Sequence, residues 1–206
     1  MLSAAVSAAI LAGGRARRYG GRDKGALVVD GRSIRERQIG ELGAIAGDIL
    51  IVGSSGQIRQ GAAPDRPPVR VVADRVPGCG PLGGLHTALI EAAFGTLVVV
   101  ACDMPYLSGA LLRHLAALTE EADIVVPRTE HGYHPLCAAY TRACLEPAAR
   151  RLADGRLKLV DLFEDVRVRS VGVEELHAFG DIRRLLANVN SPEDHRELDE
   201  FQSYQR

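Results

Sequence analysis

The sequence contains few aromatic residues and no tryptophan: Phe, Trp and Tyr together make up 4% of its 206 residues. Single-stranded nucleic acid is commonly held by stacking its bases on aromatic side chains, so this composition argues against that function. An excess of charge of either sign is also absent, because the 25 Lys and Arg residues are balanced by 26 Asp and Glu residues. A net charge of −1 offers no broad basic field to nucleic acid or to an anionic membrane.

Cysteine pairs and long apolar runs are missing as well. The four cysteines never occur as C-x-x-C, so neither a zinc site nor a disulfide framework is indicated, and we expect reduced thiols. The N-terminal run MLSAAVSAAILAGG is apolar, but no Lys or Arg precedes Arg15, so the positive region of a signal peptide is lacking. No run reaches the roughly 18 apolar residues of a membrane span. We therefore expect a cytoplasmic protein without membrane or nucleic-acid contacts.

Short apolar runs alternate with helical patterns along the chain. Helices are expected after Ser33, at Pro81 and after Ser108, because serine caps a helix and proline suits its first turn. Continuous apolar strands that alternate with helices are typical of a mostly parallel sheet covered on both faces. We expect a single-domain, three-layer, Rossmann-like α/β fold over residues 1–206. The predicted strands cover residues 8–12, 49–52, 69–73, 97–101 and 124–126.

The second half is less regular. The pattern predicts a strand over residues 134–140, a helix over 141–152 that Pro147 kinks or restarts, a short helix over 157–163 and a half-exposed strand over 166–171. A final helix is expected from Ser191, because S-P-E-D places a cap, a proline and acids in its first turn.

The first apolar run ends in LAGGRARRYGGRDKG, residues 11–25, which is rich in both glycine and basic residues. Glycines allow the backbone to come close to a ligand, and consecutive N–H groups can surround an anion. The loop therefore predicts a phosphate site, although a solvated surface turn is the simpler alternative. It is not a Walker loop, because Lys24 is followed by Gly25 and not by Ser or Thr.

This loop resembles the signature LAGGxSxRMGxDKG of the molybdenum cofactor guanylyltransferases, members of a wider nucleotidyltransferase family. The resemblance implies a nucleotidyltransferase fold with a nucleotide-binding half at about residues 1–106 and an acceptor-side half at about 107–206. It also implies backbone contacts of Leu11, Ala12, Gly13 and Gly14 to a guanine nucleotide. Arg15 and Arg18 would assist at the triphosphate.

Two carboxylates follow predicted strands, where ligands of such sheets bind. Asp103 comes directly after the strand over 97–101 and is the best candidate for a magnesium ligand, since Mg²⁺ takes few carboxylates plus phosphate oxygens and water. Asp74 follows the strand over 69–73. Either could instead be an ordinary turn aspartate. The resemblance favours the functional interpretation, because the family holds magnesium at an Asp in C-D-x-P and contacts the nucleotide with an Asp ahead of G-P-L-x-G.

Lys24 is expected to reach the phosphates as a flexible point charge, and to act in catalysis together with Asp103. One position departs from the family: Gly53 stands where an asparagine often contacts the nucleotide, so base selectivity is left open. Ser54 or Ser55 could substitute for that asparagine.

The resemblance extends into the second half of the chain. His134-Pro135 matches the family's His-Pro pair. The run from Asn188 to Asp194, NVNSPED, matches its NVNTPED ending, in which the asparagines belong to the pterin side of the pocket. Asn188 and Asn190 could otherwise be turn residues.

Residues 78–83 also fit the dinucleotide pattern G-x-G-x-x-G, which raises an NAD-dependent oxidoreductase as an alternative. Against it, residues 74–77 separate the glycines from the preceding strand, and the loop over 11–25 is left without a role.

The sequence therefore predicts a Mg²⁺-dependent enzyme that transfers GMP from GTP to the terminal phosphate of molybdopterin and releases pyrophosphate. Transient contact with molybdoenzyme clients or cofactor chaperones is expected. A cytidylyltransferase acting on the same acceptor and a non-catalytic adaptor that binds GTP and pterin remain as alternatives.

Overall fold

A central sheet of mostly parallel strands organises the molecule. The computed structural model describes residues 6–12, 24–53, 67–189 and 193–194. The strands of the sheet lie in the order β10-β7-β9-β6-β1-β4-β5, with β8 beside β7, while β2 and β3 form a separate hairpin. The strands are β1 (Val6–Leu11), β2 (Val28–Val29), β3 (Arg32–Ser33), β4 (Asp48–Val52), β5 (Val69–Val72), β6 (Thr96–Ala101), β7 (Ile124–Thr129), β8 (Gly132–Tyr133), β9 (Cys137–Thr141) and β10 (Val168–Val171).

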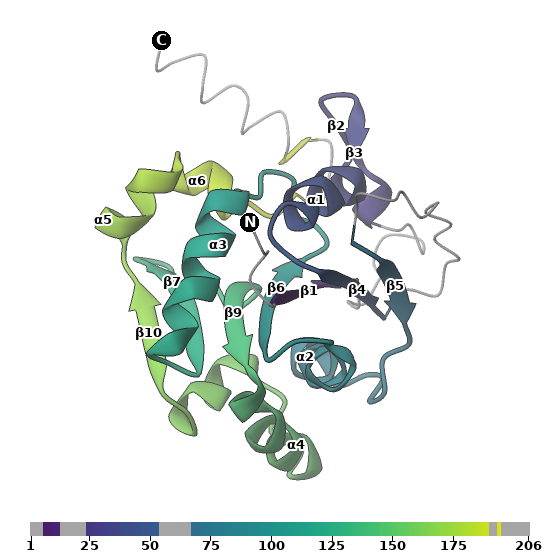
Figure 1. Cartoon of the computed structure of the whole chain (residues 1–206), viewed down its shortest axis with the longest axis vertical. Helices are drawn as coiled ribbons and strands as arrows, with labels where there is room; N and C mark the ends of the chain where they lie inside the picture. Colours follow the sequence, from purple (N-terminus) through teal and green to yellow (C-terminus); the bar gives the residue numbers. More distant parts are fainter. Residues whose placement is uncertain (1–5, 13–23, 54–66, 190–192, 195–206) are drawn as a thin grey trace.

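Helices cover the sheet on both faces, as Figure 1 shows with α1 and α3 on one side and α2 and α4 on the other. The α-helices are α1 (Ile34–Gly43), α2 (Gly80–Glu91), α3 (Gly109–Ala117), α4 (Leu145–Ala153), α5 (Val173–Leu176) and α6 (Ile182–Leu185). Short 3-10 helices are η2 (Lys24–Ala26), η3 (Leu118–Glu120), η4 (Arg142–Cys144), η5 (Leu159–Glu164) and η6 (His177–Phe179). None of the described helices is long and apolar enough to cross a membrane.

Each core strand buries alternate residues on opposite faces of the sheet. In β1, Ala8 and Ile10 pack with α1 and α3, whereas Ala9 and Leu11 pack with α2. All six residues of β1 are buried, because the strand lies between β4 and β6 and under helices on both sides. This continuous burial explains why the inner strands appear in the sequence as unbroken apolar runs.

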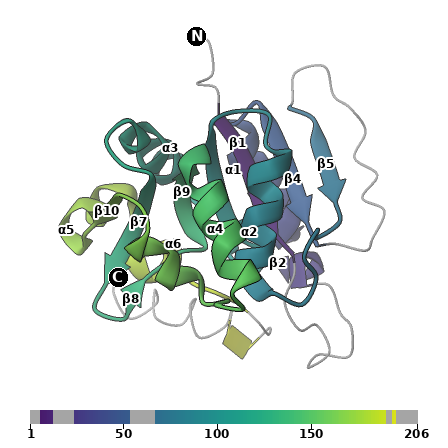
Figure 2. The same ribbon diagram turned by 90° about the horizontal axis from the view of Figure 1, so that it is seen from below.

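Strand β9 is antiparallel to both of its neighbours, β6 and β7. Strands β6 and β7 therefore run in the same direction, together with β1, β4, β5 and β10. The carboxyl ends of six strands thus lie at one edge of the sheet, which Figure 2 shows spread from β10 to β5. We refer to this edge as the carboxyl edge.

The predicted caps are confirmed. The Ser33 hydroxyl accepts a hydrogen bond from Glu36 N (3.2 Å), and the Glu36 carboxylate accepts one from Ser33 N (2.9 Å), which completes a capping box on α1. The Ser108 hydroxyl accepts from Leu111 N (3.2 Å) at the start of α3. Pro81 occupies the first turn of α2, where its missing N–H costs nothing.

The second half differs from its prediction in three places. The strand expected over 134–140 is instead β9, which begins only at Cys137, because Pro135 cannot donate to a ladder and Cys137 N closes a turn onto His134 O (3.0 Å). The helix expected over 141–152 is η4 followed by α4, with Pro147 in the first turn of α4, so the proline accompanies a restart. The short helix expected over 157–163 is the 3-10 helix η5.

Candidate functional site

The carboxyl ends of β1, β4, β5 and β6 are joined by hydrogen bonds beyond the last paired residues. Ala12 N donates to Val52 O (2.9 Å), and Gly53 N donates to Val72 O (3.0 Å). Cys102 N donates to Leu11 O (3.3 Å). Three of the predicted contact positions, Leu11, Ala12 and Gly53, therefore lie side by side, and Asp103 follows one residue after Cys102. The structure brings together at one edge what the sequence placed at separate strand ends.

The side chain of Leu11 is 6% exposed and belongs to the core between the sheet and α2. Its carbonyl and the Ala12 amide already hydrogen-bond within the sheet. Gly13, Gly14, Arg15 and Arg18 lie outside the described residues, as do Ser54 and Ser55.

Asp103 lies in a tight turn between β6 and α3. Met104 N closes this turn onto Ala101 O (3.4 Å), and the Asp103 carbonyl accepts a hydrogen bond from Val189 N (2.7 Å). The second bond brings the C-terminal segment to the turn, so that exposed Asn188 is next to a residue in direct contact with Asp103. Asn190, predicted to act with Asn188, is not among the described residues.

Asp74 lies two residues beyond β5, against the start of α2. Its Oδ1 atom accepts hydrogen bonds from Val76 N (3.0 Å) and from the buried Thr87 hydroxyl (3.1 Å). A Cβ at Gly83 would come within 2.8 Å of Val76 O, so the absent side chain lets α2 approach this loop closely. The turn role and the functional role of Asp74 are therefore compatible, because one carboxylate oxygen fixes the loop and Oδ2 makes no hydrogen bond within the described residues.

Gly53 has φ +83°, in the left-handed region. Glycine adopts this conformation freely, and asparagine is among the few other residues that tolerate it. The asparagine that the family often carries at this position would thus fit the same backbone. The departure at Gly53 removes an amide side chain without requiring another path for the chain.

The backbone of Lys24 begins η2, directly before a small apolar cluster at the carboxyl edge. Val29, Ile34 and Val189 form the buried part of this cluster, and Leu27 and Tyr106 pack against it. The segment after Lys24, the turn after Asp103 and the C-terminal segment therefore meet in one place. The side chain of Lys24 is not among the described parts of the structure.

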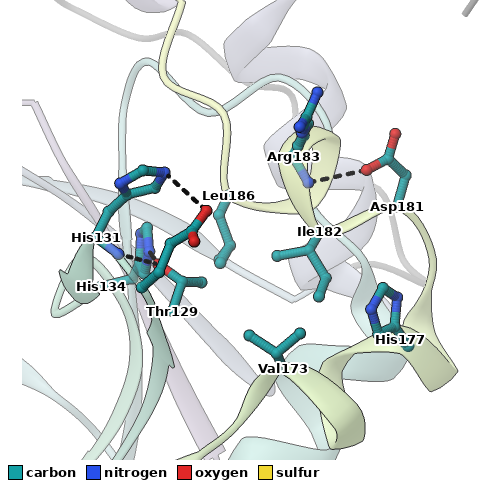
Figure 3. Close-up of a pocket in the computed structure, with 10 residues that line it drawn as sticks. Thr129, His131, His134, Val173, His177, Asp181, Ile182, Arg183 and Leu186 are labelled. Carbon is teal, nitrogen blue, oxygen red and sulfur yellow. Dashed lines mark hydrogen bonds and ion pairs between the residues drawn. The ribbon is translucent and has the colours of Figure 1, made fainter.

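A cavity of about 610 Å³ opens beside this region, between the β7–β8 hairpin and the α5–α6 segment. Figure 3 shows His131, His134 and Thr129 on one side of it and His177 on the other, with the apolar side chains of Val173, Ile182 and Leu186 between them. We call it the histidine pocket. Its lining residues are Thr129, Glu130, His131, His134, Val173, His177, Asp181, Ile182, Arg183 and Leu186.

The histidines of this pocket differ in environment. His134 Nε2 lies 3.0 Å from Thr129 Oγ1, and Nε2 of the exposed His131 lies 3.5 Å from Glu130 Oε1. Burial, and to a lesser extent the neighbouring His131, lowers the pKa of His134 below its usual value. His134 is therefore a neutral imidazole at neutral pH and offers both a hydrogen-bond donor and an acceptor.

The carboxylate oxygens at the carboxyl edge are suitable ligands for a magnesium ion that also binds a triphosphate. Within the described residues, no three side chains of His, Cys, Asp or Glu are grouped to hold a metal. Magnesium in nucleotide sites commonly takes one or two carboxylates and completes its shell with phosphate oxygens and water. Asp103, after β6, offers carboxylate oxygens of this kind. Asp74 lies at the same edge after β5, with β1 and β4 between the two strands.

The sequence interpretation missed Gln38 and Thr87, which lie behind the two carboxylates, and His131 and His177. A signal existed for Gln38, which occupies the second position in the series Ile34, Gln38 and Leu42, spaced four apart on the buried face of α1. A polar residue on such a face requires a partner. His177 had no comparable signal. Its sequence surroundings are those of an exposed residue, and it comes near the β7–β8 hairpin only in the folded chain.

The mostly parallel sheet and its carboxyl-edge site define a nucleotidyltransferase of the α/β class, and comparison with known proteins supports this assignment. The family model described as "MobA-like NTP transferase domain" matches residues 8–169. The chain belongs to this family of enzymes. The match covers strands β4, β5 and β6 and the β7–β8 hairpin of the histidine pocket.

Relatives in this family carry a more specific name. A protein of Pelotomaculum thermopropionicum named probable molybdenum cofactor guanylyltransferase is 39% identical, over 90% of this chain and 87% of its own. A molybdenum cofactor guanylyltransferase of Desulfosudis oleivorans is 31% identical, over 92% of each chain. The NAD-dependent alternative loses its basis, since the glycines of residues 78–83 lie inside the region that the NTP transferase family model matches.

Solved structures agree on the fold. The molybdopterin-guanine dinucleotide biosynthesis protein A of Archaeoglobus fulgidus superposes with a TM-score of 0.77 at 26% identity, over 96% of this chain and 99% of that one. The 2-C-methyl-D-erythritol 4-phosphate cytidylyltransferase of Thermus thermophilus superposes with a TM-score of 0.69 at 16% identity, over 97% and 99% of the two chains. The second likeness concerns the fold alone.

Proposed function

We propose that this chain transfers GMP from GTP to the terminal phosphate of molybdopterin. An oxygen of that phosphate bonds to the α-phosphorus of GTP, the bond from the α-phosphorus to the β-phosphate oxygen breaks, and pyrophosphate leaves. The observation that carries the proposal is that Ala12, Asp74 and Asp103 lie at one edge of the sheet, where the glycine-rich loop begins after Ala12.

Asp103 would hold Mg²⁺, Asp74 at the end of β5 would contact the nucleotide, and the bound ion would neutralise charge on the triphosphate. Such reactions depend mainly on positioning and electrostatic stabilisation. Lys24, whose backbone starts η2 directly after the loop, would add a positive charge at the phosphates. The loop amides of Gly13 and Gly14 would surround the anion. The attacking phosphate is already ionised near neutral pH, so the mechanism requires no general base.

The acceptor would enter from the side of the histidine pocket. This pocket lies at the carboxyl edge, because β7 and β6 run in the same direction. Leu186 in its wall lies three residues before Val189, whose N–H donates to Asp103 O. Apolar side chains beside the neutral imidazole of His134, which can donate and accept hydrogen bonds, suit a flat heterocycle with polar edges. Asn188 lies on the same segment, between the pocket and Asp103.

Because Gly53 lacks the side-chain amide of the family's asparagine, CTP remains as one alternative to GTP. An asparagine amide at this position could read a base edge, and glycine cannot. The names of the relatives favour guanine. An enzyme of cofactor assembly that consumes GTP would work in the cytoplasm and pass its product to molybdoenzyme clients or chaperones.

The test is pyrophosphate release with molybdopterin and Mg²⁺, with GTP and CTP supplied in parallel. We expect release that depends on the acceptor and favours GTP. A preference for CTP would move the chain to cytidylyl transfer with the same fold. No release with either nucleotide would contradict the proposal.

Two variants control this assay. Asp103→Asn keeps the size of the side chain but removes its charge, and we expect turnover to fall by at least about a hundredfold, as for loss of a group that stabilises charge in the transition state. Glu121→Gln removes an exposed carboxylate that precedes β7, at the opposite edge of the sheet, and should leave turnover unchanged. Near-normal turnover of Asp103→Asn would remove Asp103 from the metal role.

A further inference from the structure

We infer that Gln38 is a positioning residue for the magnesium carboxylate: its buried amide clamps both ends of the turn that carries Asp103. This inference rests on the proposed function, in which Asp103 holds the metal. The residues involved come from distant parts of the chain, since Gln38 lies on α1 and the turn follows β6.

The contacts of Gln38 are specific to this turn. Its Nε2 atom donates hydrogen bonds to Ala101 O (2.7 Å) and to Met104 O (3.0 Å). These are the first and last residues of the turn, and the Ala101 carbonyl also accepts the bond from Met104 N that closes it. Since both acceptors are carbonyls, only the NH₂ group of the amide can face them, which determines the orientation of the side chain.

Packing alone gives no reason for a glutamine at this position. Gln38 is 1% exposed and shares the core face of α1 with Ile34 and Leu42. Its Oε1 atom is buried and has no hydrogen-bond partner within the described residues. An apolar side chain of the same size would avoid that cost. The glutamine instead adds two hydrogen bonds, one before Cys102 and one after Asp103.

Gln38 also connects the metal turn to the phosphate side of the site. Helix α1 begins directly after the β2–β3 hairpin, and Ile34 N donates to Leu27 O (2.9 Å), one residue after η2, the helix that begins at Lys24. Helix α1 is therefore connected to the segment that begins at Lys24 and also carries the Gln38 amide that holds the Asp103 turn. This arrangement sets the Asp103 turn relative to the segment that begins at Lys24 before a ligand arrives.

Removal of the clamp should weaken metal binding more than nucleotide binding. We would measure Mn²⁺ binding by electron paramagnetic resonance with GTP present and no acceptor, and GTP binding without metal by calorimetry. For Gln38→Met we expect about a tenfold weaker Mn²⁺ affinity, the lower end of the effect of removing outer-shell support from a metal ligand. GTP affinity without metal should stay unchanged, and turnover should recover at high Mg²⁺.

The matched control is Ile39→Val, which removes a methylene from the adjacent buried position of α1 without touching the turn. It should lower stability and leave Mn²⁺ affinity unchanged. Equal Mn²⁺ affinities for Gln38→Met and the wild type would overturn the inference. So would equal losses of Mn²⁺ and GTP affinity in Gln38→Met, which would indicate a structural role only.

Gln38→Glu serves as the second variant if Gln38→Met does not fold. A carboxylate at this position would face two carbonyl oxygens, and only its protonated form could donate to one of them. Its Mn²⁺ affinity relative to the wild type should therefore recover as the pH falls from about 8 to about 6, since burial raises the pKa of a carboxyl group. A constant ratio would overturn the inference. Failure of the wild type to bind Mn²⁺ with GTP would instead overturn the proposed function, and the role of Gln38 with it.

Discussion

Asp74 is held to its loop through one carboxylate oxygen, which is compatible with the nucleotide contact proposed for it. Thr87, which is fully buried, donates from its hydroxyl to Asp74 Oδ1 (3.1 Å) and accepts from Arg75 N (3.0 Å). Thr87 thus holds both the Asp74 carboxylate and the backbone of the next residue, Arg75. Because Oδ1 is engaged in this way, the rotation of the carboxylate is restricted, and Oδ2 makes no hydrogen bond within the described residues.

We expect Thr87→Val to weaken GTP binding. The substitution keeps the shape of the side chain but removes the hydroxyl, which costs about 1 kcal/mol for a typical hydrogen bond and corresponds to about fivefold in affinity. Isothermal titration with GTP measures the effect. Thr87→Ser, which keeps the hydroxyl and removes only the methyl group, is the control. Equal affinities of the two variants would show that the hydroxyl does not orient Asp74.

The strand-end positions of the two carboxylates could be predicted from the sequence, but the side chains that support them could not. Asp103 and Asp74 were found from the sequence because each follows an apolar run, and ligands bind at such strand ends. Thr87 and Gln38 were not found, since each lies within a helical pattern and its partner is distant in sequence, 63 and 66 positions away for the carbonyls that Gln38 holds.

Helix α2 approaches the sheet closely through two consecutive glycines. A Cβ at Gly84 would lie 3.3 Å from the Leu11 side chain, and one at Gly83 would lie 2.8 Å from Val76 O, which is backbone. The first contact can relax by a small movement of the leucine. The second requires the loop of Asp74 or the whole helix to move.

Gly83→Ala should therefore destabilise the protein although alanine favours helices. We expect a loss of about 1–3 kcal/mol, as for overpacking of a well-packed site, together with weaker GTP binding because the Asp74 loop shifts. Gly40→Ala is the matched control, because Gly40 is inside α1 and a Cβ there meets nothing within 4 Å. It should stabilise by about 0.5–1 kcal/mol. Chemical denaturation of both variants measures the difference, and a neutral Gly83→Ala would contradict the close approach.

The elements themselves were predictable where capping and continuous burial coincide. Helices α1 and α3 begin where Ser33 and Ser108 predicted, because a serine cap is a local interaction between neighbours. The irregular second half was predicted less well. There the ladder partners of β9 determine where the strand begins, and Pro135 prevents it from starting earlier.

In the molecule as a whole, β10 is attached to the outer side of β7 by an ion pair as well as by its ladder. Arg167 donates from Nε and Nη2 to the Asp123 carboxylate (3.1 and 2.9 Å) and from its backbone N (3.0 Å). The side-chain hydrogen bonds from Arg167 lower the pKa of Asp123 below its usual value. Arg151 likewise lowers the pKa of Asp165, chiefly through its side-chain hydrogen bond.

These lowered pKa values predict a loss of stability in acid. A carboxyl whose folded pKa is below its unfolded value, near 4, stabilises the fold above that pH and loses its contribution as the pH falls through the folded pKa. We expect Asp123→Asn to lower the melting temperature at pH 7 by about 2–4 °C. Below about pH 3, the difference in melting temperature between this variant and the wild type should become smaller.

Thermal melts between pH 7 and pH 2.5 provide the measurement for this pair of proteins. Glu121→Gln is the control, since exposed Glu121 makes no ion pair within the described residues. It should follow the wild type throughout. A difference between Asp123→Asn and the wild type that stays constant with pH would contradict the assignment of the effect to the ionised carboxylate.

The sequence by itself determined the buried strands, the caps of α1 and α3, the class of fold and the strand-end positions of Asp74 and Asp103. These features depend on neighbours within a few residues, so apolar runs and spacing record them. The role of the loop over residues 11–25, which lies mostly outside the described residues, stays a prediction.

Only the tertiary structure decided which distant groups meet. The reversal at β9 turns the end of β7 toward the same edge as Asp103, and this brings the hairpin histidines opposite α5 and α6. The contacts of Gln38 and Thr87 likewise join a helix to a strand end. Such pairings result from the collective packing of helices on both faces of the sheet, and no local period in a sequence encodes them.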